Sequence, residues 1–167
     1  MGKRELEAPL LNKIVDIEQV SALAEQWKAA GEKIVFTNGV FDLLHIGHVS
    51  YLTKAAELGD RLIIGLNADS SVKRLKGENR PVNNQLSRSV ILASMFFVDA
   101  IVLFEEDTPL KLISLLLPDI LVKGADYQIE KIVGAKEVLA NGGDVQTIDF
   151  VDGHSSSAII DRIKKQV

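Results

Sequence analysis

Residues 33–48 read Lys-Ile-Val-Phe-Thr-Asn-Gly-Val-Phe-Asp-Leu-Leu-His-Ile-Gly-His. The run begins as a short apolar segment rich in β-branched side chains, and Asn38-Gly39 ends it, which is typical of a buried strand followed by a tight turn. Apolar residues at helical spacing follow from position 47 to 58, and Gly59 closes them. The segment therefore predicts a strand, a glycine-bearing loop and a helix in succession.

The same alternation continues in both directions along the chain. Before the first strand, residues 14–30 predict an amphipathic helix that ends at Gly31, and residues 1–12 carry the weakest pattern and are predicted as a disordered tail. After it, the patterns predict strands at 61–67, 100–104, 119–123 and 145–150, and helices at 86–97, 108–117, 130–141 and 156–165. Apolar strands separated by helices predict an α/β fold, a doubly wound parallel sheet with helices on both faces.

Composition narrows the classes of function. The 167 residues, 47% of them hydrophobic, suffice for one core, and no linker or repeat divides them, so we expect a single domain over 1–167. The net charge of −4 does not favour nucleic acid or an anionic membrane as a partner, and the absence of cysteine excludes disulfides and cysteine-ligated metals. No segment has the length of a membrane span, and the N-terminus does not resemble a signal peptide. We therefore expect a soluble, cytoplasmic protein.

Two of the three histidines, His45 and His48, lie in the loop after the first strand. Three residues apart, they would share one face of a helical first turn, where the helix dipole favours bound anions. Gly39 would permit close approach of the backbone to a phosphate, and Gly47 would let the chain pass beneath a nucleotide. A zinc site formed by the histidines and Asp42 is the competing interpretation, although zinc normally needs further protein ligands.

The loop at 37–48 resembles that of the H-x-G-H nucleotidyltransferases. Three later motifs extend the resemblance: Arg74–Asn83 followed by Arg88, then Val122–Tyr127, and then Asp152–Ser157. In this order they are similar to the motifs of the bacterial D-glycero-β-D-manno-heptose 1-phosphate adenylyltransferases, over about residues 31–165. That family has members fused to a sugar kinase; this chain has no room for a kinase domain and resembles the free-standing form. The resemblance implies a Rossmann-like nucleotidyltransferase fold.

The resemblance also implies roles for individual residues. The residues with an implied catalytic role are His45, His48, Lys76 and Arg88. Those implied to bind the substrate are Asp42 and Arg80. Those implied to bind the nucleotide are Thr37, Asn38, Gly39, Phe41, Gly47, Lys123, Gly124, Asp126, Ser155, Ser156 and Ser157. The chain departs from the family pattern at Val40, where cysteine is common, and at His154 and the serines after it; we interpret His154 as non-catalytic.

The implied reaction is attack of a sugar 1-phosphate on the α-phosphorus of ATP, which releases pyrophosphate and leaves an ADP-heptose for lipopolysaccharide core synthesis. We expect Mg²⁺ as the cofactor, bound through the ATP phosphates, and no metal ligand from the protein. Two alternatives stay open: a cytidylyltransferase for glycerol 3-phosphate or a similar alcohol phosphate, and a non-catalytic nucleotide-binding regulator. The amphipathic segment 14–27, with Trp27, favours a homodimer.

Overall fold

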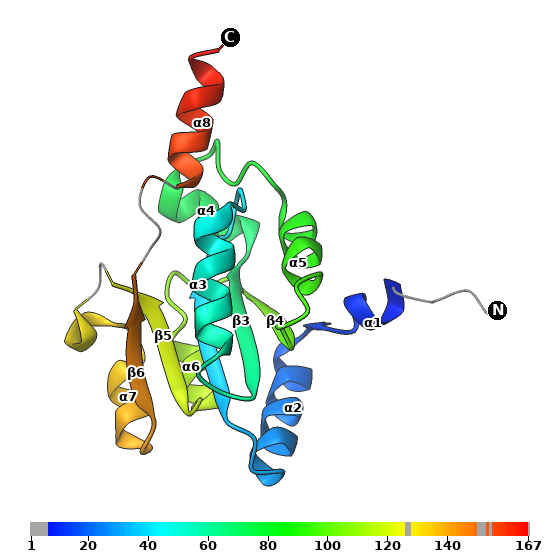
Figure 1. The fold of residues 1–167 in the computed structure, drawn as a ribbon, viewed down its shortest axis with the longest axis vertical. Coiled ribbons are helices and arrows are strands. Elements are labelled where there is room, and N and C mark those ends of the chain that lie inside the picture. Colours follow the sequence, from blue (N-terminus) through cyan, green and yellow to red (C-terminus); the bar gives the residue numbers. More distant parts are fainter. Residues whose placement is uncertain (1–6, 126–127, 150–152, 154, 167) are drawn as a thin grey trace, which may run out of the picture.

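A computed structural model describes residues 7–125, 128–149, 153 and 155–166. Its six strands form one sheet in the order β1-β4-β3-β2-β5-β6, and every neighbouring pair is parallel (Figure 1). The strands are β1 (Ile14–Val15), β2 (Ile34–Gly39), β3 (Arg61–Asn67), β4 (Ala100–Phe104), β5 (Ile120–Gly124) and β6 (Asp144–Ile148). This topology confirms the predicted doubly wound α/β class.

Helices cover both faces of the sheet. They are α1 (Glu7–Leu11), α2 (Ile17–Ala29), α3 (Ile46–Ala56), α4 (Asp69–Lys76), α5 (Gln85–Ala93), α6 (Leu110–Leu116), α7 (Ala135–Ala140) and α8 (Ser156–Lys164), with a short 3₁₀ helix η1 (Ile129–Lys131). One core cluster packs α2, α6 and α7 against one face, and a second packs α3 and α5 against the other. None of these helices is long and apolar enough to cross a bilayer.

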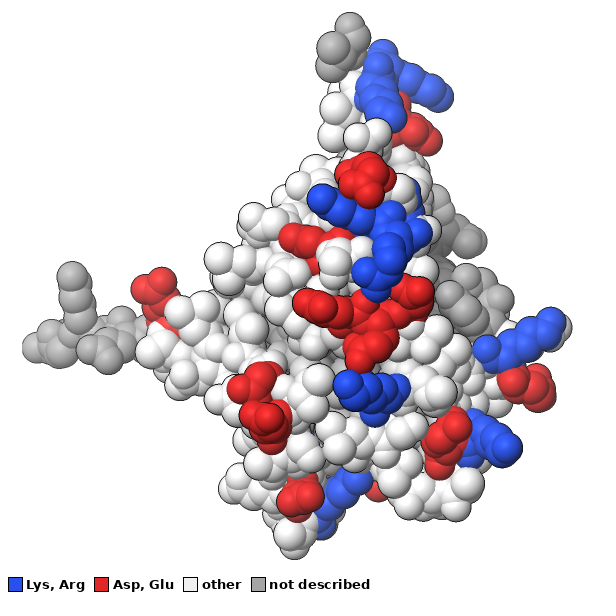
Figure 2. All heavy atoms as spheres, turned by 180° about the vertical axis from the view of Figure 1, so that it is seen from behind, with Lys and Arg blue, Asp and Glu red and all other residues white. Residues whose placement is uncertain are grey.

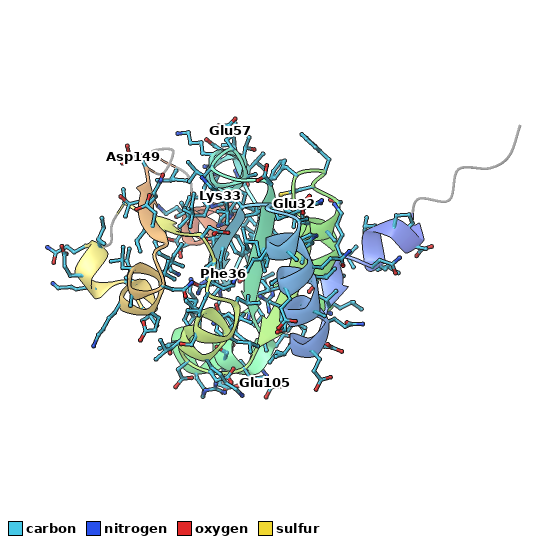
Figure 3. The ribbon with its side chains drawn as sticks, turned by 90° about the horizontal axis from the view of Figure 1, so that it is seen from below. Glu32, Lys33, Phe36, Glu57, Glu105 and Asp149 are labelled. Carbon is cyan, nitrogen blue, oxygen red and sulfur yellow. The ribbon has the colours of Figure 1, made fainter. Side chains whose placement is uncertain are left out.

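Strand β2 shows how the sequence supplies both cores. Ile34 and Phe36 belong to the first cluster, and Val35, between them, belongs to the second, because successive side chains on a strand point to opposite faces. Seen from below, Phe36 lies in the middle of the molecule, whereas Glu57 and Glu105 lie at its outer edges (Figure 3). All three β2 side chains are fully buried, and each contributes roughly 1.5–3 kcal/mol of hydrophobic stabilisation.

The strand order reverses at β2. From β2 the chain runs outward to β3 and then β4, and it returns to the other side of β2 to form β5 and then β6. Ligands of open α/β sheets bind outside the carboxyl ends of the strands at such a switch point. The end of β2 carries Asn38 and Gly39, and the end of β5 carries Lys123 and Gly124. The fold therefore brings two of the predicted motifs to one edge of the sheet.

The N-terminal region differs from the prediction in two places. Ile14 and Val15 pair with Ile101 and Val102 of β4 and form a strand, so the helix predicted at 14–30 begins only at Ile17. Residues 7–11, predicted as part of a disordered tail, form α1, which packs against α5. A two-residue strand inside a run of helical spacing leaves no separate signal in the sequence.

Two further segments differ from the sequence prediction. The helix predicted at 130–141 is divided into η1 and α7, because Gly134 between them adopts a left-handed φ of 87°; a Cβ at this position would lie 2.7 Å from the Ile113 side chain. Residues 69–76, for which no helix was specified, form α4. At the other end of the chain, α8 stands away from the body of the molecule (Figure 1) and has no fully buried residue.

Candidate active site

A pocket of about 540 Å³ lies at the carboxyl edge of the sheet. Strands β2, β3 and β5 contribute Asn38, Asn67 and Lys123 to its lining, and the loop after β2 contributes the residues up to Asp42. Helix α3 contributes His48. The position agrees with the site that the switch in strand order predicts, and it brings the motif after β2 together with the motif after β5.

The two histidines form a stack at the start of α3. His45 is the residue that precedes the first turn, His48 lies within that turn, and the centroids of their rings are 3.9 Å apart. The ring of Phe41 packs edge-on against His48 at 5.3 Å. His48 lines the pocket, whereas His45 does not. His48 is therefore the histidine placed to touch a ligand, and the rings of His45 and Phe41 hold its orientation.

Phe41 explains the glycine at position 39. Phe41 is 6% exposed and has a left-handed φ of 46°, so its ring turns back over the end of β2. A Cβ added at Gly39 would lie 2.9 Å from Cε2 of that ring. The predicted reason for Gly39 was close approach to phosphate, but the structure gives a second one, the packing of Phe41. Gly47 is buried within α3 and is outside the pocket lining.

The electrostatic state of His48 follows from this packing. Burial, the neighbouring His45 ring and the Lys76 ammonium together lower the pKa of His48 to about 4. The imidazole is therefore neutral at pH 7 and donates one N–H. Its Nδ1 is buried and has no hydrogen-bond partner among the described residues. A phosphate anion in the pocket would favour the protonated form and raise this pKa.

The predicted substrate-binding residues Asp42 and Arg80 contact each other instead. The Asp42 carboxylate accepts hydrogen bonds from the backbone N–H groups of Val82, at 2.8 and 3.0 Å, and Asn83, at 3.0 Å. Arg80 Nε lies 2.9 Å from Asp42 Oδ2, an ion pair without hydrogen-bond alignment. Asp42 thus anchors segment 80–83 to the loop after β2, and the substrate-binding role of both residues stays a prediction.

For Arg88 and Thr37 the predicted direct contact with a ligand is wrong in this structure, because both side chains are fully buried. Arg88, for which the resemblance implied a catalytic role, is 0% exposed and is outside the pocket lining; its guanidinium donates hydrogen bonds to protein acceptors, two of which, the carbonyls of Val40 and Asn67, belong to lining residues. Thr37, predicted to bind the nucleotide, is also 0% exposed, and its hydroxyl lies 2.7 Å from the hydroxyl of Tyr51. Tyr51 lines the pocket, so Thr37 contacts a lining residue without belonging to the lining itself.

The cationic run after β3 divides into paired side chains and one that reaches the pocket. Lys73 lies 3.9 Å from Glu78, and Arg74 pairs with Asp107 at 2.8 Å and also donates to the Glu105 carbonyl. Lys76, at the end of α4, lines the pocket. The structure therefore places the predicted phosphate ligand Lys76 where that role requires it, and the role itself stays a prediction.

Two further lysines line the pocket. Lys123, predicted from its motif, donates to the Asn38 carbonyl at 3.4 Å. The other is Lys131 in η1, which no sequence motif predicted. Its position just after the Val122–Tyr127 motif is the one signal that could have found it. Acidic and basic side chains lie side by side on the rear face of the molecule (Figure 2).

The serines at the start of α8 have separate contacts. Ser155 caps the helix by accepting the Ala158 N–H at 3.0 Å, whereas Ser156 donates to the Leu43 carbonyl at 2.9 Å and lines the pocket. Ser157 is exposed and outside the lining. Asp126 and His154 fall outside the described residues. Ser156 is thus the serine of the three that the structure brings to the pocket.

The zinc interpretation gains no support. Among the described residues, no group of three or more His, Asp or Glu side chains could hold a metal ion. Asp42, the third ligand that this interpretation needs, is occupied by Arg80 and two backbone N–H groups.

The sequence matches a known protein family over most of its length. The family described as cytidylyltransferase-like matches residues 36–162. The chain belongs to the cytidylyltransferase-like family. This membership confirms the resemblance of the loop at 37–48 to nucleotidyltransferases, and the matched range runs from the first residues of the pocket to the helix α8.

The chain is similar to curated proteins over most of its length. The "Bifunctional protein HldE" of Haemophilus ducreyi is 55% identical over 90% of this chain, and that of Cronobacter sakazakii is 58% identical over 87%. The matches cover 32% and 31% of those proteins, so this chain spans about a third of the length of the curated relatives it matches.

Solved structures show the same architecture. The lipopolysaccharide core biosynthesis protein from Thermoplasma volcanium GSS1 has a TM-score of 0.58 and 30% identity, and the match covers 72% of this chain and 98% of that protein. The pantoate-beta-alanine ligase from Francisella tularensis has a TM-score of 0.60 at 16% identity, covering 92% of this chain and 79% of that one, and it shows the fold alone.

Proposed function

We propose that the chain is a nucleotidyltransferase that joins ATP and D-glycero-β-D-manno-heptose 1-phosphate to give ADP-heptose and pyrophosphate, a step that supplies lipopolysaccharide core synthesis. The observation that carries the proposal is the convergence of His48 and Lys76 with Lys123 and Lys131 on one pocket at the switch point of the sheet. The heptose specificity rests on the motif resemblance and on the similarity to the HldE proteins.

The charges of the pocket favour polyphosphate ligands. Of the described residues in its lining, the carboxylates are Asp42 and Asp107, and each is ion-paired with an arginine. The lining lysines therefore dominate the local potential in a chain whose net charge is −4. ATP and a sugar phosphate together bring several negative charges to one cavity, and a cleft with one sign of charge attracts such ligands.

In this reaction the protein positions the two substrates and neutralises the charge on their phosphates. An oxygen of the sugar phosphate attacks the α-phosphorus; the new P–O bond forms as the bond to the bridging α–β oxygen breaks, and pyrophosphate leaves with that oxygen. The nucleophile is already an anion at pH 7, so no general base is needed. His48 donates its N–H to an α-phosphate oxygen, and Lys76 neutralises charge that develops on the leaving group.

Mg²⁺ enters this scheme as part of the substrate MgATP. The Asp42 oxygens already receive hydrogen bonds from Val82 and Asn83, and Asp107 is paired with Arg74. The described lining therefore offers no spare carboxylate to a resident metal, and the phosphate oxygens of ATP supply the ligands that Mg²⁺ prefers. A cytoplasmic location and a homodimer stay predictions.

A second candidate keeps the pocket and changes the substrates. It is a cytidylyltransferase that acts on glycerol 3-phosphate or a similar alcohol phosphate; the family description names cytidylyl transfer but no acceptor, and the similarity to the HldE proteins does not favour this candidate. Both candidates need the same histidine and the same lysines, so the distinction lies in the base and in the acceptor.

The test is pyrophosphate release with Mg²⁺, in which ATP and CTP are each crossed with the heptose 1-phosphate and with glycerol 3-phosphate. We expect release only with ATP and the heptose phosphate. Release only with CTP and glycerol 3-phosphate would favour the second candidate. The absence of release with all four pairs would favour a non-catalytic nucleotide-binding regulator. The same assays with His48→Ala measure the pyrophosphate release that does not depend on His48.

A further inference from the structure

Arg88 is the largest fully buried side chain of the molecule as described, and its guanidinium lies behind the pocket. It donates four hydrogen bonds: Nε to the Asn83 carbonyl at 3.0 Å, Nη1 to the Val40 carbonyl at 2.6 Å, and Nη2 to the Asn67 carbonyl at 2.9 Å and to Asp69 Oδ1 at 2.7 Å. Three of these acceptors are backbone carbonyls. The arginine therefore binds backbone segments in addition to its ion pair with Asp69.

The four acceptors belong to three segments around the pocket: the loop after β2, the junction of β3 with α4, and the segment that precedes α5. Val40 lies in the loop that leads to His48, and Asn67 ends β3 and lines the pocket. Asp69 is the first residue of α4, the helix that ends at Lys76, and the fourth acceptor lies in the segment held by Asp42. One planar group thus fixes the histidine loop relative to the helix that carries the pocket lysine.

We propose that Arg88 is the positioning residue of this site: its guanidinium sets the distance between His48 and Lys76, and so aligns their contacts with the reacting phosphates. The proposal rests on the proposed function for its kinetic consequence. The guanidinium is suited to the task because its donors are fixed in one plane and point in several directions at once. A lysine keeps the charge, but its compact ammonium cannot reach all four acceptors.

Arg61 supplies a matched control. It also joins separate segments, through ion pairs with Glu32 at 2.8 Å and Asp99 at 3.1 Å, but it lies at the amino end of β3, away from the pocket. Arg61→Lys and Arg88→Lys therefore make the same chemical change near opposite ends of β3, since Arg61 begins the strand and Arg88, in α5, donates to the carbonyl of its last residue, Asn67. A general loss of structure would affect both variants, whereas a loss of alignment would affect only the second.

The experiment compares the wild type with Arg88→Lys and Arg61→Lys by kcat, by KM for MgATP and by circular dichroism at a temperature where the variants are folded. We expect Arg88→Lys to lower kcat by at least about tenfold with a smaller change in KM, because a misplacement of about 1 Å costs up to a hundredfold in rate. Arg61→Lys is expected to keep kcat within about twofold, since it leaves the site untouched. Equal kcat values for the two folded variants would overturn the proposal.

A second readout does not depend on turnover. The ¹⁵N resonances of the His48 imidazole report its packing against Phe41 and His45, and we expect them to shift in Arg88→Lys and not in Arg61→Lys. If the wild type fails to release pyrophosphate, the proposed function is wrong, and this spectrum still decides whether Arg88 positions the loop. Should Arg88→Lys fail to fold, Asp69→Asn removes a single acceptor and is expected to shift the same resonances; unchanged resonances would overturn the proposal.

Discussion

The contact between Asp42 and segment 80–83 is the clearest place to test the architecture of the site. The Asp42 side chain is 1% exposed and that of Arg80 is 15% exposed, so their ion pair at 2.9 Å is largely shielded from water. Asp42→Asn removes the charge and turns one acceptor into a donor that faces Arg80. Breaking a buried pair by changing one partner costs about 3–5 kcal/mol, and the retained amide oxygen places the expected loss near the lower end, at about 3 kcal/mol.

The assay is urea denaturation of the wild type, Asp42→Asn, Arg80→Met and the double variant. Because the two side chains interact directly, their effects should not add, and the cycle should give a coupling energy of at least about 1 kcal/mol. Asp42→Asn should also lower kcat about tenfold, since the segment that it releases adjoins the loop of His48. A loss of stability under about 1 kcal/mol, or strictly additive effects, would refute this view of the contact.

Four other predictions concern His48 and its surroundings. His48→Ala should lower kcat about a hundredfold, the effect of removing one transition-state donor, and a loss under fivefold in the folded variant would contradict that role. An NMR titration of the empty protein should give a His48 pKa of about 4, and MgATP should raise it. With this lowered pKa, the folded protein binds fewer protons than the unfolded chain between about pH 4 and 6.5. His48 therefore contributes stability above pH 6.5 that is lost as the pH falls through this window. The free energy of unfolding of the wild type should fall more in this window than that of His48→Gln. Gly39→Ala should displace Phe41 and lower kcat at least about tenfold, whereas Gly31→Ala, at a φ of 77° outside the pocket, should cost stability and leave kcat unchanged.

The order of strands and helices is largely predictable from the sequence for a physical reason. A strand buried on both faces is apolar throughout, as at 34–36 and 62–66, and the turn residues after it mark its end. The switch point follows from the parallel sheet, and it locates the pocket before any side chain is placed. Strand β1 escaped prediction because its pairing with β4 is a tertiary contact over only two residues.

The roles of the cations were harder to predict, because they depend on where distant carboxylates and carbonyls lie. Arg74, Lys76 and Arg80 look alike in the sequence, yet two of them pair with Asp107 and Asp42 and only Lys76 lines the pocket. Arg88 opens an apolar helix, and the resemblance implied a catalytic role for it; its acceptors come from segments up to 48 positions away. A local pattern carries no information on such contacts.

A competition experiment tests the central claim most directly. Equal concentrations of ATP, CTP, the heptose 1-phosphate and glycerol 3-phosphate are mixed with Mg²⁺ and the protein, and mass spectrometry measures the products at low conversion, so that their ratio gives the ratio of kcat/KM values. We expect ADP-heptose in large excess over every other product. Predominance of CDP-glycerol, or formation of ADP-heptose at the same rate by His48→Ala, would contradict it.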